Sequence, residues 1–343
     1  MRDLVQLRSF SERQDRTKRR ALIILGAAIA AAPRRLLGQG ARRPRIGYLL
    51  VTPLTEPPSL ERQAFLDGLL DQGYVPGTSV EIVYRSAEGE ADFIDDTCRD
   101  LLARNPDVIV VSGAISALSA KRATRSVPIV MLAVGDPVGI GAVSSLAKPG
   151  GNVTGVSFIS SDLAPKRLQF AKECVPRAKK LTSIWDSRNA NARAESGAVL
   201  AAAKQFDLSV ESLGLASDAE LARALHRLAS AKPEILYVAF EGGLASANRT
   251  TLAEFGLRQR VPIVSGWSSI TEAGALLSYA PDIPAMFRRA AYYVARVLKG
   301  AKPAALPIEL PTKVDLVINL RTARRIGVSI PREMLLRADR VIE

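Results

Sequence analysis

The sequence predicts a two-lobed α/β protein in which each lobe contains a parallel sheet covered by helices on both faces. The 343 residues exceed one ordinary domain and suit two α/β lobes of roughly 130–150 residues each. From residue 44 onward, short apolar runs alternate with segments whose apolar residues recur at helical spacing. Apolar runs without polar alternation are typical of strands buried on both faces, as in parallel sheets.

The first alternating array precedes a stretch rich in proline and glycine at 147–155. A gap of this composition is typical of a crossing between lobes. The array has predicted strands at 46–51, 80–84, 108–111 and 127–133, and predicted helices at 59–72, 93–104 and 116–125.

A second, similar array follows, and then a tail. Its predicted helices lie at 164–174, 192–206, 219–231 and 246–255, and its strands at 181–185, 208–213, 234–240 and 261–265. The tail has predicted strands at 275–279 and 314–319, and helices at 285–299 and 321–326.

We therefore expect residues 44–155 plus 267–306 to form lobe 1, and residues 156–266 plus 307–343 to form lobe 2. The chain would cross between them near Gly155, Gly266 and Pro307. Crossings of this kind form a three-segment hinge, about which two lobes can close around a ligand.

Residues 1–40 resemble a leader segment. Nine Lys/Arg against three Asp/Glu give this stretch about half of the formal charge of +13, and an apolar run at 21–32 follows Arg19 and Arg20. This run is too short to span a bilayer. A basic segment, a short apolar run and small residues are the layout of a secretory signal, and the arginine pair leaves twin-arginine export open. A helix of the folded domain and an uncleaved anchor remain alternatives.

The rest of the charge is scattered along predicted helices, and aromatic residues make up only 5% of the chain. A scattered basic excess acts on solubility and weak attraction, and a stacking surface for single strands needs interleaved aromatics. We therefore expect no nucleic-acid partner.

The sequence also lacks the motifs of common catalytic and cofactor sites. It has no P-loop, no complete dinucleotide fingerprint and no nucleophile elbow. His226 is the only histidine and lies in an amphipathic helical segment, while Cys98 and Cys174 are expected to be free thiols rather than a disulfide. We expect no catalytic residue, no metal site and no cofactor.

Small polar and aromatic residues instead follow the strands of both arrays. In open α/β sheets, ligands bind beyond the carboxyl ends of the strands, where helix N-termini offer N–H groups to anions. Each position alone is explained by an ordinary turn, and only their recurrence favours a site. The candidate ligand-binding residues are Thr52, Ser112, Gly113, Gly135, Asp136, Trp185, Asp186, Phe240, Glu241 and Trp267.

Long segments of the chain also resemble a known family. The stretch GDPVGIGAVSSLAKPGGNVTGVSF at 135–158 and the tail from RRAAYYVARVLKGAKP at 288–303 through LLRADRVI at 335–342 resemble ABC-transporter substrate-binding proteins of the tryptophan/tyrosine type. The resemblance covers essentially residues 44–343. It implies a type I periplasmic-binding fold, export to the periplasm, and delivery of a solute to a permease whose ATPase is a separate chain.

The leading hypothesis is thus an extracytoplasmic solute-binding protein, monomeric, that takes a small polar or amino-acid-like ligand between its lobes. In this hypothesis Asp136 or Glu241 contacts an amine, and Ser112 with nearby N–H groups contacts a carboxylate. A ligand-sensing module of a signalling receptor is the alternative. An enzyme with a Rossmann-like sheet is a third class, disfavoured by the missing phosphate-binding motifs.

Overall fold

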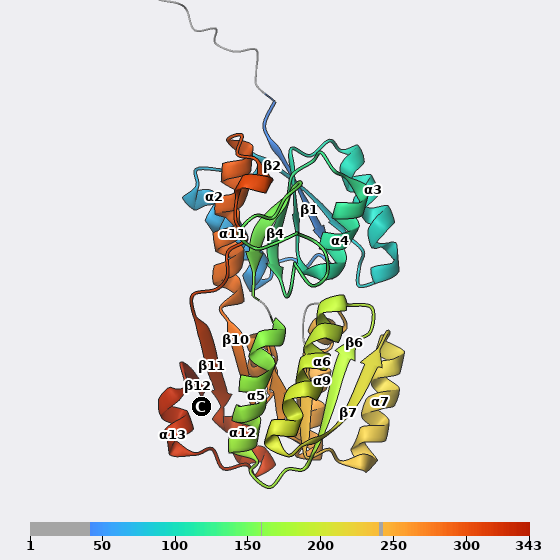
Figure 1. The fold of residues 1–343 in the computed structure, drawn as a ribbon, viewed down its shortest axis with the longest axis vertical. Coiled ribbons are helices and arrows are strands. Elements are labelled where there is room, and N and C mark those ends of the chain that lie inside the picture. Colours follow the sequence, from blue (N-terminus) through green and yellow to red (C-terminus); the bar gives the residue numbers. More distant parts are fainter. Residues whose placement is uncertain (1–41, 159, 240–242) are drawn as a thin grey trace, which may run out of the picture. The chain divides into compact units, whose positions relative to one another are not determined.

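A computed structural model describes residues 42–158, 160–239 and 243–343 (Figure 1). The predicted leader at 1–40 lies outside these residues. Over the three described ranges, no helix has both the length and the apolar character needed to cross a membrane.

The first sheet has five parallel strands in the order β2-β1-β3-β4-β5. This order is typical of a doubly wound sheet, in which the strand order reverses beside the first strand. The strands are β1 (Arg45–Leu50), β2 (Glu81–Ser86), β3 (Val108–Val111), β4 (Ile129–Val134) and β5 (Val153–Ser157). The helical segments of this part are α2 (Leu60–Asp71), η1 (Ala91–Phe93), α3 (Ile94–Ala103), α4 (Gly113–Ala123), α11 (Ile283–Leu298) and η3 (Pro303–Ala305).

The second sheet has the order β12-β11-β10-β9-β8-β6-β7, and its one antiparallel pairing joins β10 to β11. Its strands are β6 (Lys180–Asp186), β7 (Ser209–Leu215), β8 (Ile235–Val238), β9 (Ile263–Ser265), β10 (Leu277–Pro281), β11 (Val314–Asn319) and β12 (Arg340–Ile342). Its helical segments are α5 (Ser160–Cys174), α6 (Ala190–Ala203), η2 (Lys204–Phe206), α7 (Asp218–Ala231), α8 (Gly243–Ala247), α9 (Arg249–Gln259), α10 (Ser268–Ala273), α12 (Leu320–Ile326) and α13 (Arg332–Arg337). The predicted α/β class with two parallel-dominated sheets is confirmed.

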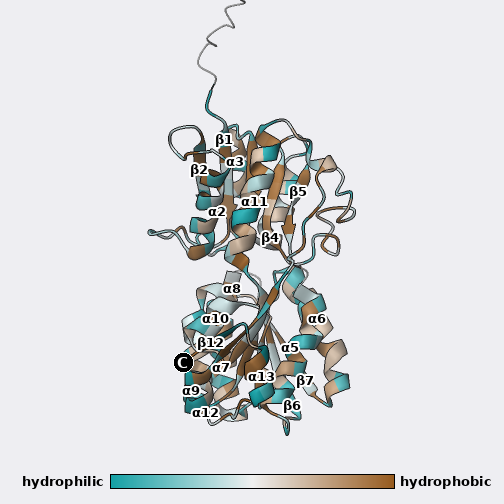
Figure 2. Cartoon of the chain, turned by 90° about the vertical axis from the view of Figure 1, so that its left-hand side faces the viewer, coloured by the Kyte–Doolittle hydropathy of each residue, from teal (hydrophilic) through white to brown (hydrophobic). Residues whose placement is uncertain are grey.

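Helices cover both faces of each sheet, which explains the continuously apolar strands. In the first sheet, α2 and α11 bury Phe65 and Phe287 on one face, while α3 and α4 bury Leu101 and Ala117 on the other. In the second sheet, α5 and α6 cover one face, and α7 and α9 cover the opposite face. Figure 2 shows this pattern as brown strands among helices that carry teal stretches.

The chain returns from the second sheet to the first later than expected from the sequence. The sequence predicts residues 267–306 in lobe 1, but β10 pairs with β9 and β11, so this strand belongs to the second sheet. The chain packs on the first sheet again at α11, which contacts α2, β4 and β5, before β11 returns it to the second sheet. The crossing expected near Gly266 therefore lies at 281–283, because hydrogen bonding of β10 to its neighbours decides its sheet.

The last crossing is fixed to the end of β5. Ser157 N–H donates to the Glu309 carbonyl at 2.9 Å, and Glu309 N–H donates to the Gly155 carbonyl at 3.0 Å. Gly155 has φ +129°, and a Cβ there would lie 2.2 Å from the Met131 carbonyl oxygen, so only glycine fits. The Glu309 carboxylate also binds Arg289 Nε of α11 at 2.9 Å. The end of β5 and the segment around Glu309 are thus held together by two backbone hydrogen bonds, and an ion pair joins that segment to α11.

Candidate functional site

The helices α4 and α6 start directly after strands at the carboxyl edges of the two sheets. At α4, Ser112 is the N-cap residue with extended backbone, and Gly113 follows with φ +79°, a conformation that favours glycine. At α6, the Asn189 carboxamide caps the helix by accepting from the N–H groups of Asn191 at 2.9 Å and Ala192 at 3.3 Å. The Ser112 side chain makes no such capping bond. The first N–H groups of α4 therefore depend on other partners.

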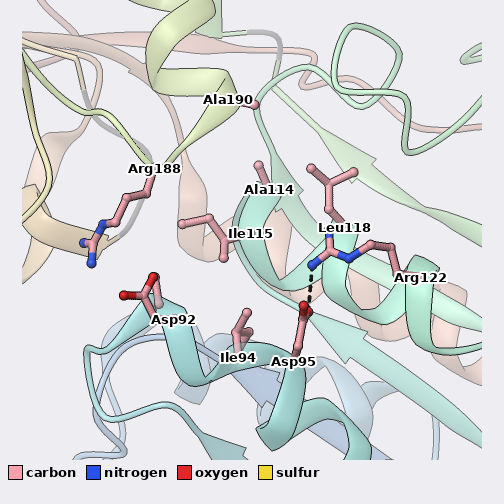
Figure 3. Close-up of a pocket in the computed structure, with 10 residues that line it drawn as sticks. Asp92, Ile94, Asp95, Ala114, Ile115, Leu118, Arg122, Arg188 and Ala190 are labelled. Atoms are coloured by element: carbon pink, nitrogen blue, oxygen red, sulfur yellow. Dashed lines mark hydrogen bonds and ion pairs between the residues drawn. The ribbon is translucent and has the colours of Figure 1, made fainter.

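A pocket of about 310 Å³ lies beside these helix starts. Its wall combines apolar side chains of α3 and α4, among them Ile94, Ile115 and Leu118, with four charged residues. Figure 3 shows Asp95 and Arg122 joined on one side, and Asp92 and Arg188 facing each other on the other side. The charges on the pocket wall balance, because two carboxylates face two guanidinium groups: Asp92, Asp95, Arg122 and Arg188.

The guanidinium of Arg188 is held in place by Asp186. The Asp186 carboxylate is 5% exposed, and it accepts from Arg188 Nε at 3.1 Å and Nη2 at 3.0 Å. The pKa of Arg188 is raised first by this hydrogen bonding and further by the charges of Asp186, Asp92 and Glu90, against partial burial. A fixed cation at this position can bind an anionic group of a ligand.

The carboxylate of Asp136 binds the backbone of the turn that follows it. Its Oδ1 accepts from the Gly139 N–H at 2.9 Å, and a Cβ at Gly139 would lie 2.1 Å from Asp136 Oδ2. The preceding Gly135 is buried, and its carbonyl accepts from Ser160 N–H at 3.2 Å. Thr52, in the bend after β1, accepts through its carbonyl from Ser86 Oγ at 2.8 Å. These polar groups have structural partners, and their contact with a ligand remains a prediction.

The two tryptophans differ in their surroundings. Trp185 lies over β7, where its Nε1 donates to Ser212 Oγ at 2.9 Å and a Cβ at Gly214 would meet its ring at 2.8 Å. Trp267 is half-buried at the N-cap of α10 and meets Phe158 edge to face, with 5.8 Å between ring centroids. Because Trp267 packs against apolar clusters of both sheets, it is the better placed of the two to offer an aromatic surface to a ligand.

The second lobe contains a buried ion pair between Arg167 of α5 and Glu195 of α6. Arg167 Nη1 lies 2.8 Å from Glu195 Oε1, and the side chains are 0% and 1% exposed. The Tyr237 hydroxyl donates to the same oxygen at 2.6 Å, and the Ser160 hydroxyl donates to Glu195 Oε2. Burial opposes the charge of Arg167, yet Tyr237 and Glu195 raise its pKa above the ordinary value. Burial also raises the pKa of Tyr237 well above its usual range, so its phenol stays neutral.

The guanidinium of Arg167 also reaches the loop after β9. Its Nε donates to the Tyr279 carbonyl at 2.8 Å, and a Cβ at Gly266 would lie 2.5 Å from its Cζ. A single side chain therefore connects α5, α6, β8, β10 and the segment before Trp267. No sign of this network was present in the sequence, because Glu195 and Tyr279 lie 28 and 112 positions from Arg167.

The structure describes eight of the ten predicted ligand-binding residues. Phe240 and Glu241 lie outside the described residues. None of the other eight lines the 310 Å³ pocket, although Ala114 follows Gly113 and Arg188 follows Asp186 by two positions. Asp92 and Arg188 were missed. For Arg188, a charge two residues after the end of β6 was the available signal, but it does not distinguish a ligand contact from a solvated loop, and Asp92 in η1 had no such signal.

Metal and thiol chemistry find no support in the described part of the chain. No group of three or more His, Cys, Asp or Glu there could hold a metal ion. Cys98 and Cys174 are buried and free, and burial raises the pKa of both thiols, that of Cys174 to about 12.

Comparison with known proteins decides the family. Residues 51–342 match the model of the family described as "ABC transporter substrate binding protein". The chain belongs to this family. It is 28% identical over 281 residues to a tyrosine-binding protein of Clostridioides difficile (strain R20291), a match that covers 81% of this chain and 80% of that protein.

Solved structures agree with this result. The crystal structure of an ABC domain from Streptococcus pneumoniae in complex with L-Trp is 28% identical, has a TM-score of 0.81, and covers 88% of this chain and 100% of that chain. A leucine-binding protein from Thermotoga maritima is 15% identical, with a TM-score of 0.55 and coverage of 75% and 83%. The second likeness concerns the fold alone. This family member therefore has a type I periplasmic-binding fold and is a solute-binding component of an ABC transporter.

Proposed function

We propose that this protein binds an aromatic or similar amino acid at the carboxyl edges of its two sheets and passes it, unchanged, to an ABC permease. The observation that carries the proposal is the 28% identity and TM-score of 0.81 to the L-Trp complex across 88% of the chain. The tyrosine-binding relative supports the same ligand class. The residues present fit a zwitterion with an aromatic side chain, because cationic, anionic and aromatic groups all occur near the helix starts.

In this proposal each candidate group has a role. Arg188, fixed by Asp186, attracts the ligand carboxylate, together with N–H groups at Ser112 and Gly113. Trp267 provides an aromatic face for the ligand side chain. The other predicted residues, Thr52, Gly135, Asp136, Trp185, Phe240 and Glu241, are proposed to line the same region.

We further propose that residues 1–40 direct export, so that the folded protein acts as a monomer in the periplasm. The basic and apolar layout of this segment supports export. The permease partner would use a separate ATPase chain, in keeping with the lack of a P-loop in this sequence.

A thermal-shift screen of the 44–343 chain against the twenty amino acids and a set of sugars and polyols tests this function. A ligand at a hundred times its dissociation constant stabilises the folded state by about 2.7 kcal/mol. We expect L-tryptophan or L-tyrosine to raise the melting temperature, and sugars to leave it unchanged. Stabilisation by sugars alone, or conversion of a bound amino acid, would contradict the proposal.

A further inference from the structure

Asn191, the second residue of α6, has an unusual environment. It is 2% exposed, and both its Nδ2 and its Oδ1 are buried without a hydrogen-bond partner among the described residues. Buried polar atoms in folded proteins nearly always have a partner, so a carboxamide with two unmet atoms needs an explanation. An amide is also a poor choice for a position that only fills space, because leucine has similar volume and no polar atoms.

Capping of the helix does not explain this side chain. Asn189 performs that role, since its Oδ1 accepts from the N–H groups of Asn191 and Ala192. The carboxamide of Asn191 is therefore left for a different partner.

Its place on α6 points toward the ligand edge. Asn191 and Glu195 are four residues apart and share the buried face of the helix, which packs against α5. Glu195 is bonded to Ser160 at the start of α5. Asn191 lies about one turn, roughly 5.4 Å, closer to the beginning of α6 and hence to the carboxyl end of β6. A second unpartnered donor, Arg167 Nη2, is buried in the same network.

Charged groups near the start of α6 restrict which head group of a ligand Asn191 can bind. Arg188, three residues before Asn191, is cationic, and Asp92 contributes a carboxylate close enough to raise the pKa of Arg188. A carboxamide offers two donors at Nδ2 and an acceptor at Oδ1. A ligand head with both a carboxylate and an ammonium group satisfies this combination, whereas a purely anionic head satisfies only the donors.

We propose that Asn191 determines specificity for the zwitterionic head of the ligand, with Nδ2–H donating to the carboxylate and Oδ1 accepting from the ammonium group. The Arg167–Glu195 pair acts as a positioning unit that holds the starts of α5 and α6 in register. This inference rests on the proposed binding of an amino acid.

Calorimetric titration of wild type and Asn191→Leu tests the proposal with L-tryptophan, tryptamine and indole-3-propionate as probes. Wild type should prefer L-tryptophan to the two analogues, each of which lacks one charged group. Loss of hydrogen bonds to charged groups should weaken L-tryptophan binding by about tenfold to a hundredfold in the variant, with much less change for the analogues. The melting temperature of the ligand-free variant should stay equal or rise, because no satisfied bond is removed.

Two further variants separate binding from folding. Asn191→Asp keeps the shape but adds a negative charge, and it should weaken binding of indole-3-propionate more than binding of tryptamine. Ser196→Ala is the matched control. Ser196 is also 2% exposed on α6, and its hydroxyl lies 2.9 Å from Ser212 Oγ. This control should lower the melting temperature slightly and leave the affinity for L-tryptophan unchanged.

These measurements distinguish a wrong assignment of Asn191 from a wrong proposed function. If Asn191→Leu lowers the melting temperature and binds L-tryptophan as wild type does, Asn191 is structural, and only this inference is overturned. If wild type binds neither L-tryptophan nor L-tyrosine, the proposed function is overturned, and the assignment of Asn191 is overturned with it.

Discussion

The two sheets have the same layered plan but bury different chemistry. On the first sheet, the helices α2, α11, α3 and α4 close both faces with apolar side chains. On the second sheet, one face also contains the Arg167–Glu195 ion pair with the hydroxyls of Ser160 and Tyr237. Removing two charges from water is costly, so a buried pair is weak evidence for stability. The buried pair is therefore better explained by the fixed geometry that it gives to α5 and α6 than by a gain in stability.

The first sheet obtains its geometry from close packing instead. At Gly68 of α2, a Cβ would lie 2.4 Å from the Arg288 carbonyl oxygen of α11. The two helices are therefore in contact at backbone level, although they are more than two hundred positions apart in the sequence. Substitutions at the buried ion pair of the second lobe and at the close helix contact of the first lobe should therefore destabilise the protein to different extents.

The largest effect is expected for Arg167→Met. The variant leaves the Glu195 carboxylate buried without its cation, and such losses cost about 3–5 kcal/mol. Urea denaturation should show this loss in the free energy of unfolding. Arg227→Met is the matched control, because Arg227 pairs with Glu211 at 2.7 Å on an exposed surface and should change stability by less than about 1 kcal/mol. Equal effects of the two substitutions would refute the contrast between the sheets.

A smaller loss is expected for Gly68→Ala. The added methyl group meets backbone of α11, so the helices must separate, at a cost of about 1–3 kcal/mol. Gly197→Ala on α6 provides the comparison, since a Cβ there has nothing within 4 Å. Alanine at this exposed position of α6 should stabilise the protein by about 0.5–1 kcal/mol. Thermal unfolding measures both, and a change of the same sign in the two variants would contradict this account of α2 and α11.

The smallest effect concerns Asp95 at the pocket wall. Hydrogen bonding from Ser119, and Arg122 with its Nη2 at 2.7 Å, lower the pKa of Asp95. A carboxyl with a lowered folded-state pKa stabilises the protein above its ordinary pKa, and this contribution is lost as pH falls through the folded-state pKa. Because the pair is half exposed, the contribution is at most about 1 kcal/mol.

Asp95→Asn should therefore be slightly less stable than wild type at pH 7, and the difference should shrink as the pH is lowered below 4. Urea titrations at pH 7, 5, 4 and 3.5 measure this difference. A difference that widens on acidification would show that Asp95 is not held as a carboxylate by its neighbours.

Much of the fold was predictable because it depends on local patterns. The run 108–111 matches β3 residue for residue, since four consecutive apolar residues between breakers are compatible only with a short buried segment. The sheet to which β10 belongs was not predictable. Its partners are decided by lateral hydrogen bonds to β9 and β11, and the strand order leaves no mark in a single sequence.

The site was predictable only as a set of loops. Strand ends gave Ser112, Gly113 and Asp186, which lie at or next to the starts of α4 and α6. Asp136 shows the limit of this method, because its carboxylate binds its own turn. The environment of Asn191 consists of its burial and the absence of a bonding partner among the described residues, and neither property can be obtained from residue type.

The central claim, that a ligand contacts the starts of α4 and α6 while the Arg167–Glu195 pair holds the start of α5 beside them, is tested most directly by amide hydrogen exchange with and without saturating L-tryptophan. The account predicts slower exchange at residues 112–117, 160–167 and 188–196, with no change in α7 or α13. Saturable binding that protects α7 or α13 and leaves those three helix starts unchanged would contradict it.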